Sequence, residues 1–129
     1  MELDLVAGLV GDAEASVNEN NTALAVGSGN LKVFATPMML ALMEEASCNA
    51  LKGKLPEGYE TVGMSVDIVH LAPTPINMKV KAKAKLINVD KRKLTFEVEA
   101  FDERERVGSG THQRFLIESN KFMEKCNNK

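Results

Sequence analysis

The segment from Lys32 to Leu51, in which a helix is expected to begin at Pro37, is the feature that most constrains the fold. Apolar residues run consecutively from Met38 to Met43, so the first two turns of this helix have no polar side. Thr36 before Pro37 is the pattern of a helix N-cap followed by the residue favoured at the first helical position, and Gly53 is typical of a helix end. A helix that is apolar all round is buried on most sides, and in a chain of 129 residues this predicts a sheet that wraps it.

After this helix the apolar residues alternate with a period of two, which is typical of half-buried strands joined by short turns. Strands are expected at 61–70, 78–86, 94–100 and 107–118, and extended pieces before the helix at 12–17 and 22–26. This order predicts an α+β fold in which one long central helix packs on a curved antiparallel β-sheet. Residues 1–129 are expected to form a single domain, with 1–10 and 120–129 as ends that fray.

A row of four lysines shares one solvated face of the strand at 78–86. We call it the lysine row: Lys79, Lys81, Lys83 and Lys85. Glu97 and Glu99, on the next strand, are expected to face outward and to pair with it. The row therefore has a structural explanation.

Composition and charge exclude several classes of function. The chain is 44% hydrophobic and 26% charged with a net charge of -2, which gives no general attraction to nucleic acid. The first residues are acidic, and no apolar run reaches the roughly 18 residues of a membrane span. Cys48 and Cys126 lack the spacing of a disulfide framework or a zinc site. We expect a cytoplasmic protein with reduced thiols, no metal, and no membrane or nucleic-acid partner.

Several polar residues lie where a buried site could form. Glu44 interrupts the apolar helix, and His70 ends the apolar face of a strand expected to look toward that helix. Thr36 supplies a hydroxyl at the helix start, and Arg114 follows the segment Gly108 to His112 (GSGTH). A glutamate that orients a histidine, with a hydroxyl within reach, is the general form of an activated nucleophile or of a general base for water.

Each candidate also has a purely structural interpretation. Thr36 can serve only as a cap, and Glu44 can belong to an ion pair on the helix surface. His70 can be a hydrogen-bonded core histidine, and Arg114 a surface cation. Geometry adds a constraint, because Thr36 and Glu44 are separated by about 12 Å along a straight helix. They cannot both touch one imidazole of the same chain.

Three segments together resemble a known family. The runs VFATPMMLALMEEAS, SVDIVHLAPTP and GSGTHQRFLI are similar, in the same order and spacing, to the fluoroacetyl-CoA thioesterase-like family of hot-dog-fold acyl-CoA thioesterases. The resemblance extends over most of residues 33–125. It implies the hot-dog fold, in which a sheet wraps a central helix, and a homodimer or higher homo-oligomer.

The resemblance also implies which residues act. It places the catalytic set at Thr36, Glu44 and His70, and substrate-binding positions at Gly63 and Arg114; we expect Phe34 to line the substrate site as well. A site at a dimer interface can draw residues from two chains, which would remove the geometric objection to a set containing both Thr36 and Glu44.

The chain departs from the family pattern at the entrance to the site. Gly27 and Asn30 stand where the fluoroacetate-specific member has the phenylalanines of a hydrophobic lid, and Pro37 replaces a glycine. The resemblance therefore predicts a small acyl chain other than a fluorinated one, and the proline should stiffen the helix start.

The leading interpretation is a thioesterase that hydrolyses an acyl-CoA to free acid and CoA, with no cofactor beyond the CoA of the substrate. His70 would be the general base, Glu44 would orient it or attack directly, and Thr36 would be the nucleophile or a hydrogen-bond donor. The lysine row could meet the CoA phosphates. Two alternatives stay open: a non-catalytic acyl-CoA-binding protein, and a hot-dog hydratase or dehydratase.

Overall fold

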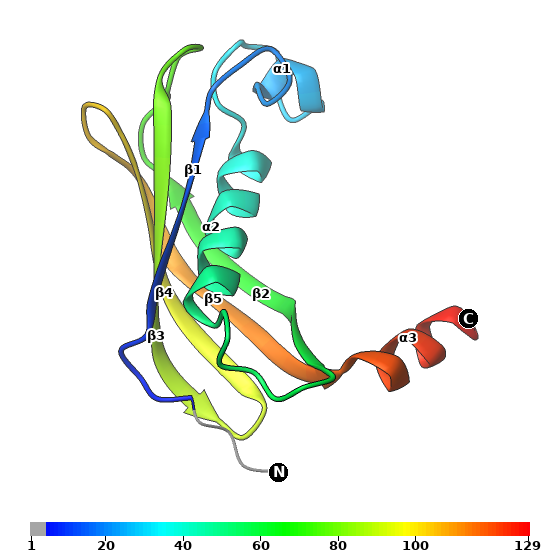
Figure 1. Ribbon diagram of the computed structural model, residues 1–129. Coiled ribbons are helices and arrows are strands. Elements are labelled where there is room, and N and C mark those ends of the chain that lie inside the picture. Colours follow the sequence, from blue (N-terminus) through cyan, green and yellow to red (C-terminus); the bar gives the residue numbers. More distant parts are fainter. Residues whose placement is uncertain (1–4) are drawn as a thin grey trace.

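Five antiparallel strands form one curved sheet, and the long helix α2 lies in its concave face (Figure 1). The computed structural model describes residues 5–129. In chain order the elements are β1 (Val10–Ser16), α1 (Ala23–Val26), α2 (Thr36–Ala50), β2 (Tyr59–His70), β3 (Lys79–Asp90), β4 (Lys93–Asp102), β5 (Arg106–Glu118) and α3 (Ser119–Asn127). The strand order β1-β3-β4-β5-β2 leaves β1 and β2 at the two edges. The α+β class and the four strands expected after the helix are confirmed.

The core lies between α2 and the inner face of the sheet. The buried side of α2 contributes Met39, Leu42, Met43, Ala46 and Ala50, and these pack on alternate residues of β3 and β4 such as Leu86 and Phe96. The opposite side of α2 is open, because Ala41, Glu45 and Cys48 are exposed. The sheet of one chain therefore covers the helix on one side only, and not on most sides as its apolar sequence predicts.

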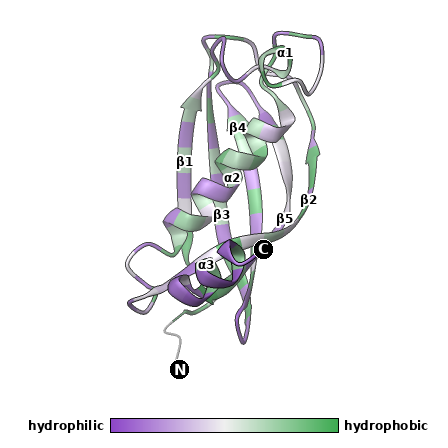
Figure 2. Cartoon of the chain, turned by 90° about the vertical axis from the view of Figure 1, so that its right-hand side faces the viewer, coloured by the Kyte–Doolittle hydropathy of each residue, from purple (hydrophilic) through white to green (hydrophobic). Residues whose placement is uncertain are grey.

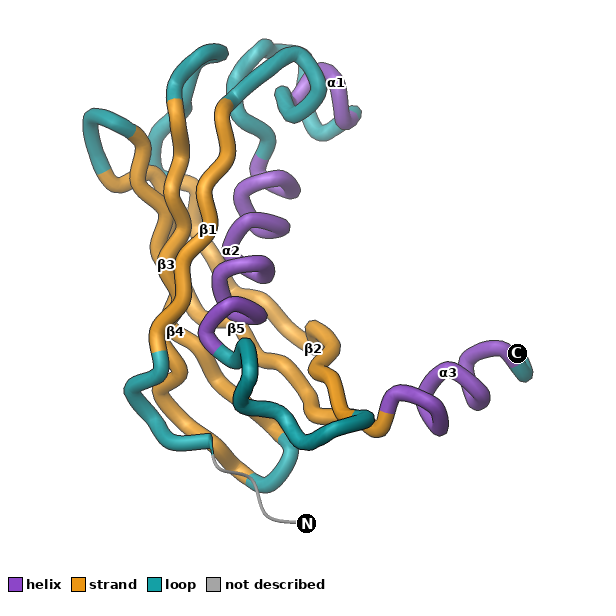
Figure 3. The backbone as a smooth tube through the Cα atoms, viewed as in Figure 1, coloured by secondary structure: helices purple, strands orange, loops and turns teal. Residues whose placement is uncertain are grey.

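At its C-terminal end α2 packs directly on β1. The backbone of Ala46 and Ala50 occupies the space that a Cβ on Gly11 would fill. A strand glycine is expected where another backbone comes this close. The helix ends at Ala50, and the loop that follows runs back beneath it to β2 (Figure 3). Gly53 takes a left-handed conformation within that loop, with a φ of 76°.

The start of α2 differs from the sequence prediction. Ala35 is the N-cap residue, no side chain caps the helix, and Pro37 lies in the first turn. Thr36 is the first helical residue. Its hydroxyl bonds to another part of the chain and does not bond to the helix backbone, so the prediction that Thr36 is an N-cap is wrong.

Strand β2 contains a bulge that changes which residues face the helix. Gly63 pairs with Arg114 and Ser65 pairs with Gln113, so Met64 is an extra residue on β2. Thr61 and Gly63 therefore face α2 together with the later Ile68 and His70. Simple alternation predicts Val62 and Met64 on that face instead, and it fails because a bulge shifts the phase of a strand by one residue.

Two short segments are helical where the sequence predicts otherwise. Residues 23–26 form α1, not an extended piece, and Thr22 caps it by accepting a hydrogen bond from the Ala25 amide at 3.2 Å. Residues 119–127 form α3, where a frayed end is expected, and α3 projects away from the sheet (Figure 1).

At the N-terminal end, Leu5 is buried and the Gly8 amide donates to the Leu86 carbonyl, so this part of the expected frayed segment 1–10 packs on the fold. Residues 1–4 lie outside the described part.

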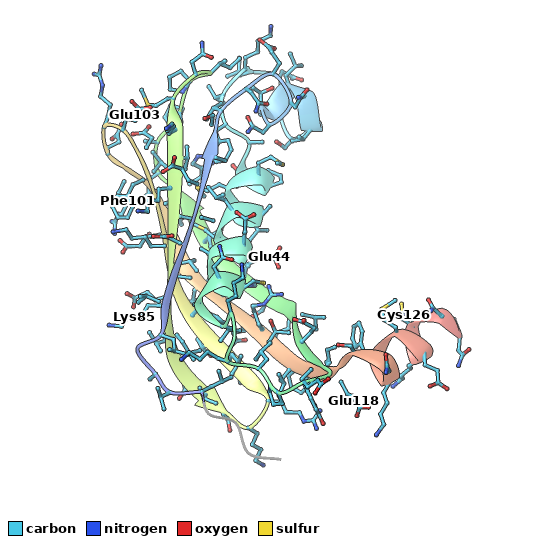
Figure 4. All side chains as sticks on the ribbon, in the orientation of Figure 1. Glu44, Lys85, Phe101, Glu103, Glu118 and Cys126 are labelled. Carbon is cyan, nitrogen blue, oxygen red and sulfur yellow. The ribbon has the colours of Figure 1, made fainter. Side chains whose placement is uncertain are left out.

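The lysine row lies on the outer face of the sheet. Lys81 pairs with Asp12 at 3.4 Å and Lys79 with Glu14 at 3.7 Å, both partners on β1. Figure 4 shows Lys85 and Phe101 on the outer side of the sheet and Glu44 on the opposite side. These pairs are exposed, so each contributes little stability. The expected acidic partners Glu97 and Glu99 lie opposite Lys85 and Lys83 in the strand register, but Glu99 makes its ion pair with Arg106, at 3.3 Å.

Candidate active site

A threonine and a histidine meet where the start of α2 approaches the end of β2. Thr36 Oγ1 lies 2.7 Å from His70 Nδ1, within hydrogen-bond distance. Thr36 is free to make this bond because Ala35, and not Thr36, takes the capping position. His70 reaches it because the last residue of β2 lies on the face of the strand that looks toward the helix. A hydroxyl bonded to an imidazole is the arrangement of a nucleophile and its base.

The other ring nitrogen of His70 is buried without a partner among the residues that the structure describes. A buried polar atom in this situation calls for a hydrogen-bond partner from outside the chain, such as water, a ligand or a second subunit. Burial also lowers the pKa of His70 below its usual value of 6.5, so the ring is neutral at pH 7. A neutral imidazole can accept a proton.

A surface pocket of about 320 Å³ adjoins this pair. Thr36 and His70 line it together with Phe34, whose side chain is buried. The remaining lining residues are small or apolar: Ala23, Ser28, Val33, Leu71, Ala72 and Pro73. The pocket therefore has room for a small apolar group next to a hydroxyl and a neutral imidazole.

Two turns further along α2, Glu44 forms a second polar group with β5. Its Oε2 accepts a hydrogen bond from Arg114 Nη1 at 3.1 Å. Arg114 is 6% exposed, and its other nitrogens donate to Thr61, through Nε to the hydroxyl at 2.9 Å and through Nη2 to the carbonyl at 3.0 Å. Arg114 is thus a buried cation with a hydrogen bond at each of its three nitrogens, and the surface-cation interpretation is wrong.

Gly63 completes this second group. A methyl group at Gly63 would lie 2.5 Å from Glu44 Oε2 and close to His112 and Arg114. A side chain at this position would therefore displace the carboxylate. A smaller pocket of about 250 Å³ opens here, lined by Glu44, Gly63, His112 and their neighbours.

His112 is a further buried member of this group, and no separate role was predicted for it. It is 1% exposed; its Nδ1 lies 2.8 Å from the Ser65 carbonyl oxygen and its Nε2 lies 3.1 Å from Arg114 Nη1. Its place in the sequence could have indicated this, because a residue two positions before Arg114 lies on the same face of the strand. Burial, followed by the Arg114 charge, lowers the pKa of His112, although the Ser65 carbonyl and Glu44 act in the opposite direction.

The structure therefore divides the predicted catalytic set. Thr36 and His70 are in contact, whereas Glu44 bonds to Arg114 and not to His70. The expectation that Glu44 orients His70 is not met within one chain, because Glu44 projects from α2 opposite the start of β2 and His70 lies at the end of that strand. The lysine row belongs to neither group.

A comparison with protein-family models matches residues 17–120 to the fluoroacetyl-CoA-specific thioesterase family. The chain belongs to this family. The fluoroacetyl-CoA thioesterase from Streptantibioticus cattleyicolor is 38% identical to this chain over 98 residues, which are 76% of this chain and 70% of the relative.

Solved structures agree with this family. A phenylalanine-to-alanine variant of the fluoroacetyl-CoA-specific thioesterase, in complex with fluoroacetate and CoA, superposes with a TM-score of 0.86 at 31% identity, covering 92% of this chain and 99% of the other. A hot-dog-like protein from Thermanaerovibrio acidaminovorans has a TM-score of 0.86 at 21% identity, covering 95% and 90% of the two chains, and supports the fold alone. The expected family and the hot-dog fold are confirmed.

Within the described part, no helix is long and apolar enough to cross a membrane. Nor do three or more histidine, cysteine or acidic side chains gather in residues 5–129 as they would around a metal ion.

Proposed function

We propose that this protein hydrolyses the thioester of a small acyl-CoA to the free acid and CoA. The observation that supports this most directly is the 2.7 Å contact between Thr36 Oγ1 and His70 Nδ1 beside a pocket with apolar walls. Family membership adds the class of substrate, because a relative has been solved with fluoroacetate and CoA.

In the proposed reaction His70 takes the proton of the Thr36 hydroxyl as Thr36 Oγ1 attacks the thioester carbonyl. The bond from the carbonyl carbon to sulfur then breaks, and the leaving CoA sulfur receives the proton from His70. Water, deprotonated by the same imidazole, then attacks the carbonyl carbon of the Thr36 ester. The bond from that carbon to Thr36 Oγ1 breaks, Oγ1 receives the proton from His70, and the acid is released. The pair lies at the N-terminal, electropositive end of α2, which stabilises negative charge on the carbonyl oxygen.

We further propose that the complete site forms between two copies of the chain. Strand β2 is an edge strand with exposed apolar residues, Met64, Val66 and Val69 (51%, 42% and 53% exposed), and the apolar colour along it is visible in Figure 2. An uncovered apolar edge of this kind favours pairing with another strand. The open side of α2 lies next to this edge.

The direction of that pairing explains how Glu44 can serve the reaction. In a two-fold pair of antiparallel β2 strands, the Gly63 end of one strand lies against the His70 end of the other. The Glu44 group of one subunit would then approach the Thr36–His70 pair of its partner, which the separation of about 12 Å along α2 prevents within one chain.

We place the protein in the cytoplasm, since both of its cysteines, Cys48 and Cys126, are free and exposed, as is usual in a reducing compartment.

The reaction is tested by thiol release from a panel of short and medium acyl-CoAs with the native protein and with His70→Ala. We expect release with the native protein and a loss of at least about 100-fold with the variant. Binding of acyl-CoA without release from any of them would instead support a binding protein. Addition of water to an enoyl-CoA without thiol release would support a hydratase.

The shared site is tested by mixing two inactive variants, His70→Ala and Glu44→Gln, after subunit exchange. Random exchange puts about half of the chains in mixed dimers, each with one complete site, so we expect recovery to about a quarter of the native rate. No recovery despite mixed dimers detected by native mass spectrometry would show that Glu44 and His70 act within one subunit.

A further inference from the structure

His112 is held in one protonation state by two neighbours of opposite hydrogen-bonding character. The Ser65 carbonyl oxygen, 2.8 Å from Nδ1, can only accept a hydrogen bond, so Nδ1 carries a proton. Arg114 Nη1, 3.1 Å from Nε2, can only donate, so Nε2 offers its lone pair. The ring is therefore the neutral tautomer with its proton on Nδ1.

The environment of the ring favours this state. His112 packs against Phe96 of β4, with the ring centroids 6.4 Å apart and the planes inclined by 30°, and it is 1% exposed. A second cation beside the Arg114 guanidinium would be strongly unfavourable in such a place. Glu44 Oε2, the nearby anion, is 3.9 Å from Nε2 and already bonds to Arg114.

The bulge in β2 supplies the other half of this arrangement. The register shifts between Gly63 and Ser65, and Ser65 is the residue whose carbonyl receives the His112 proton. The same shift brings Gly63 under the Glu44 carboxylate. One irregularity of the strand thus makes room for the carboxylate and fixes the imidazole.

A single chain of hydrogen bonds results. The Ser65 carbonyl accepts a hydrogen bond from His112 Nδ1, and His112 Nε2 accepts one from Arg114 Nη1. Arg114 Nη1 also donates to Glu44 Oε2. The two bonds to Thr61 fix the rest of the guanidinium. The position of the carboxylate is therefore set by Arg114, and the position of Arg114 depends on an acceptor at His112.

We propose that His112 is a positioning residue, a permanently neutral hydrogen-bond acceptor that aims Arg114 and through it holds the Glu44 carboxylate in the acyl-CoA site. In this role it acts through Arg114 and takes no part in proton transfer or attack. This rests on the proposed function in one respect, namely that Glu44 serves thioester hydrolysis.

Two substitutions separate the acceptor from the bulk of the ring. In His112→Gln the amide oxygen reaches the place of Nε2 and can accept from Arg114, whereas in His112→Asn the shorter amide reaches only the place of Nδ1. We expect His112→Asn to lower kcat by about 10- to 100-fold, because small displacements of a catalytic group cost this much. His112→Gln should keep kcat within about fivefold of native, and KM should change less than kcat in both. Thr111→Ala, an exposed neighbour on the opposite face of β5, is the control.

Equal kcat values for the Asn and Gln variants would overturn the proposal, as would losses of kcat that simply follow the losses in melting temperature.

A second measurement needs no activity and no variant. Long-range proton–nitrogen NMR of the native protein, which has only two histidines, should show His112 as the neutral tautomer with the proton on Nδ1 at pH 7. A proton on Nε2, or a charged ring, would refute the positioning role even if the enzyme is active. Failure of the native protein to cleave any thioester would refute the proposed function, but it would not change the tautomer of His112 that NMR measures.

Discussion

Thr36 and His70 are joined side chain to side chain, Oγ1 to Nδ1 at 2.7 Å, although they lie 34 residues apart in the sequence. The contact uses the first residue of α2 and the last residue of β2. It is the link between the helix and the edge strand on which the proposed chemistry depends.

Removal of the Thr36 hydroxyl should abolish most of the activity without harming the fold. We expect Thr36→Ala to lower kcat by at least about 100-fold, because the nucleophile is lost, and Thr36→Ser to keep part of it. Thr36 is exposed and caps nothing, so the melting temperature should change little. Mass spectrometry of the native protein during turnover should detect an acylated Thr36; an active Thr36→Ala enzyme would show instead that water is activated directly.

The two adjacent glutamates of α2 form a natural pair for comparison. Glu44 bonds to Arg114, whereas Glu45 is exposed. We expect Glu44→Gln to reduce kcat/KM by about 100-fold or more, the range of a lost catalytic carboxylate, and Glu45→Gln to stay within about twofold of native. Steady-state kinetics on the best acyl-CoA substrate measures both. The reverse ranking would mean that the wrong glutamate has been assigned.

The activity should depend on the neutral form of His70. Burial lowers its pKa below 6.5, so the neutral base is present at pH 7 and is lost only as the pH falls through the lowered value. The acidic limb of the pH profile of kcat/KM should therefore lie below pH 6.5. The same limb should persist in His112→Gln, since His112 does not exchange protons in the reaction. A limb above pH 6.5 would contradict the assignment.

Gly63→Ala should act through Glu44. The added methyl group would lie 2.5 Å from Oε2, so the carboxylate must move. We expect a loss of kcat/KM of about 10- to 100-fold, as for other small displacements in active sites. In a Glu44→Gln background the same substitution should cost little more, because residues that share one contact are not additive. Full additivity in this double-mutant cycle would place the effect elsewhere.

Gly11→Ala tests the packing of α2 on β1 and not the chemistry. The backbone of Ala46 and Ala50 fills the space of the new methyl group, and overpacking of this kind costs about 1–3 kcal/mol. Chemical denaturation should show a lower free energy of unfolding. Gly29→Ala, where Ala23 Cβ at 3.3 Å is the one neighbouring atom within 4 Å in the described structure, should change it much less.

Sequence patterns predicted the position of the helix and of the strands well, because a long apolar run and a strict alternation of apolar residues each indicate one kind of element. The apolar run at 38–43 and the alternation after residue 61 led directly to α2 and to the sheet. The tail 119–127 was expected to fray because it is polar and lacks core residues, yet it forms α3, a helix without a buried residue. The segment 22–26 was too short for its period to distinguish a strand from a single helical turn.

The candidate residues could be selected from the sequence, but their contacts with one another could not. Family resemblance selected Thr36, Glu44, His70, Gly63 and Arg114, and the structure places each of them in one of two polar groups. The family resemblance could not identify the partner of Glu44, because the bulge at Met64 determines which residues of β2 face the helix. The role of His112 was missed for the same reason: its acceptor, Ser65, is on the far side of the bulge.

The bulge at Met64 has a consequence in the parity of the strand. An odd number of positions separates Gly63 from His70, and in a regular strand an odd separation places two residues on opposite faces. Because Met64 has no partner on β5, Gly63 and His70 are separated by an even number of paired positions, and both face α2. Deleting Met64 would thus do more than shorten β2: it would turn one of the two polar groups outward, and a compensating second deletion or insertion beyond His70 could not restore it.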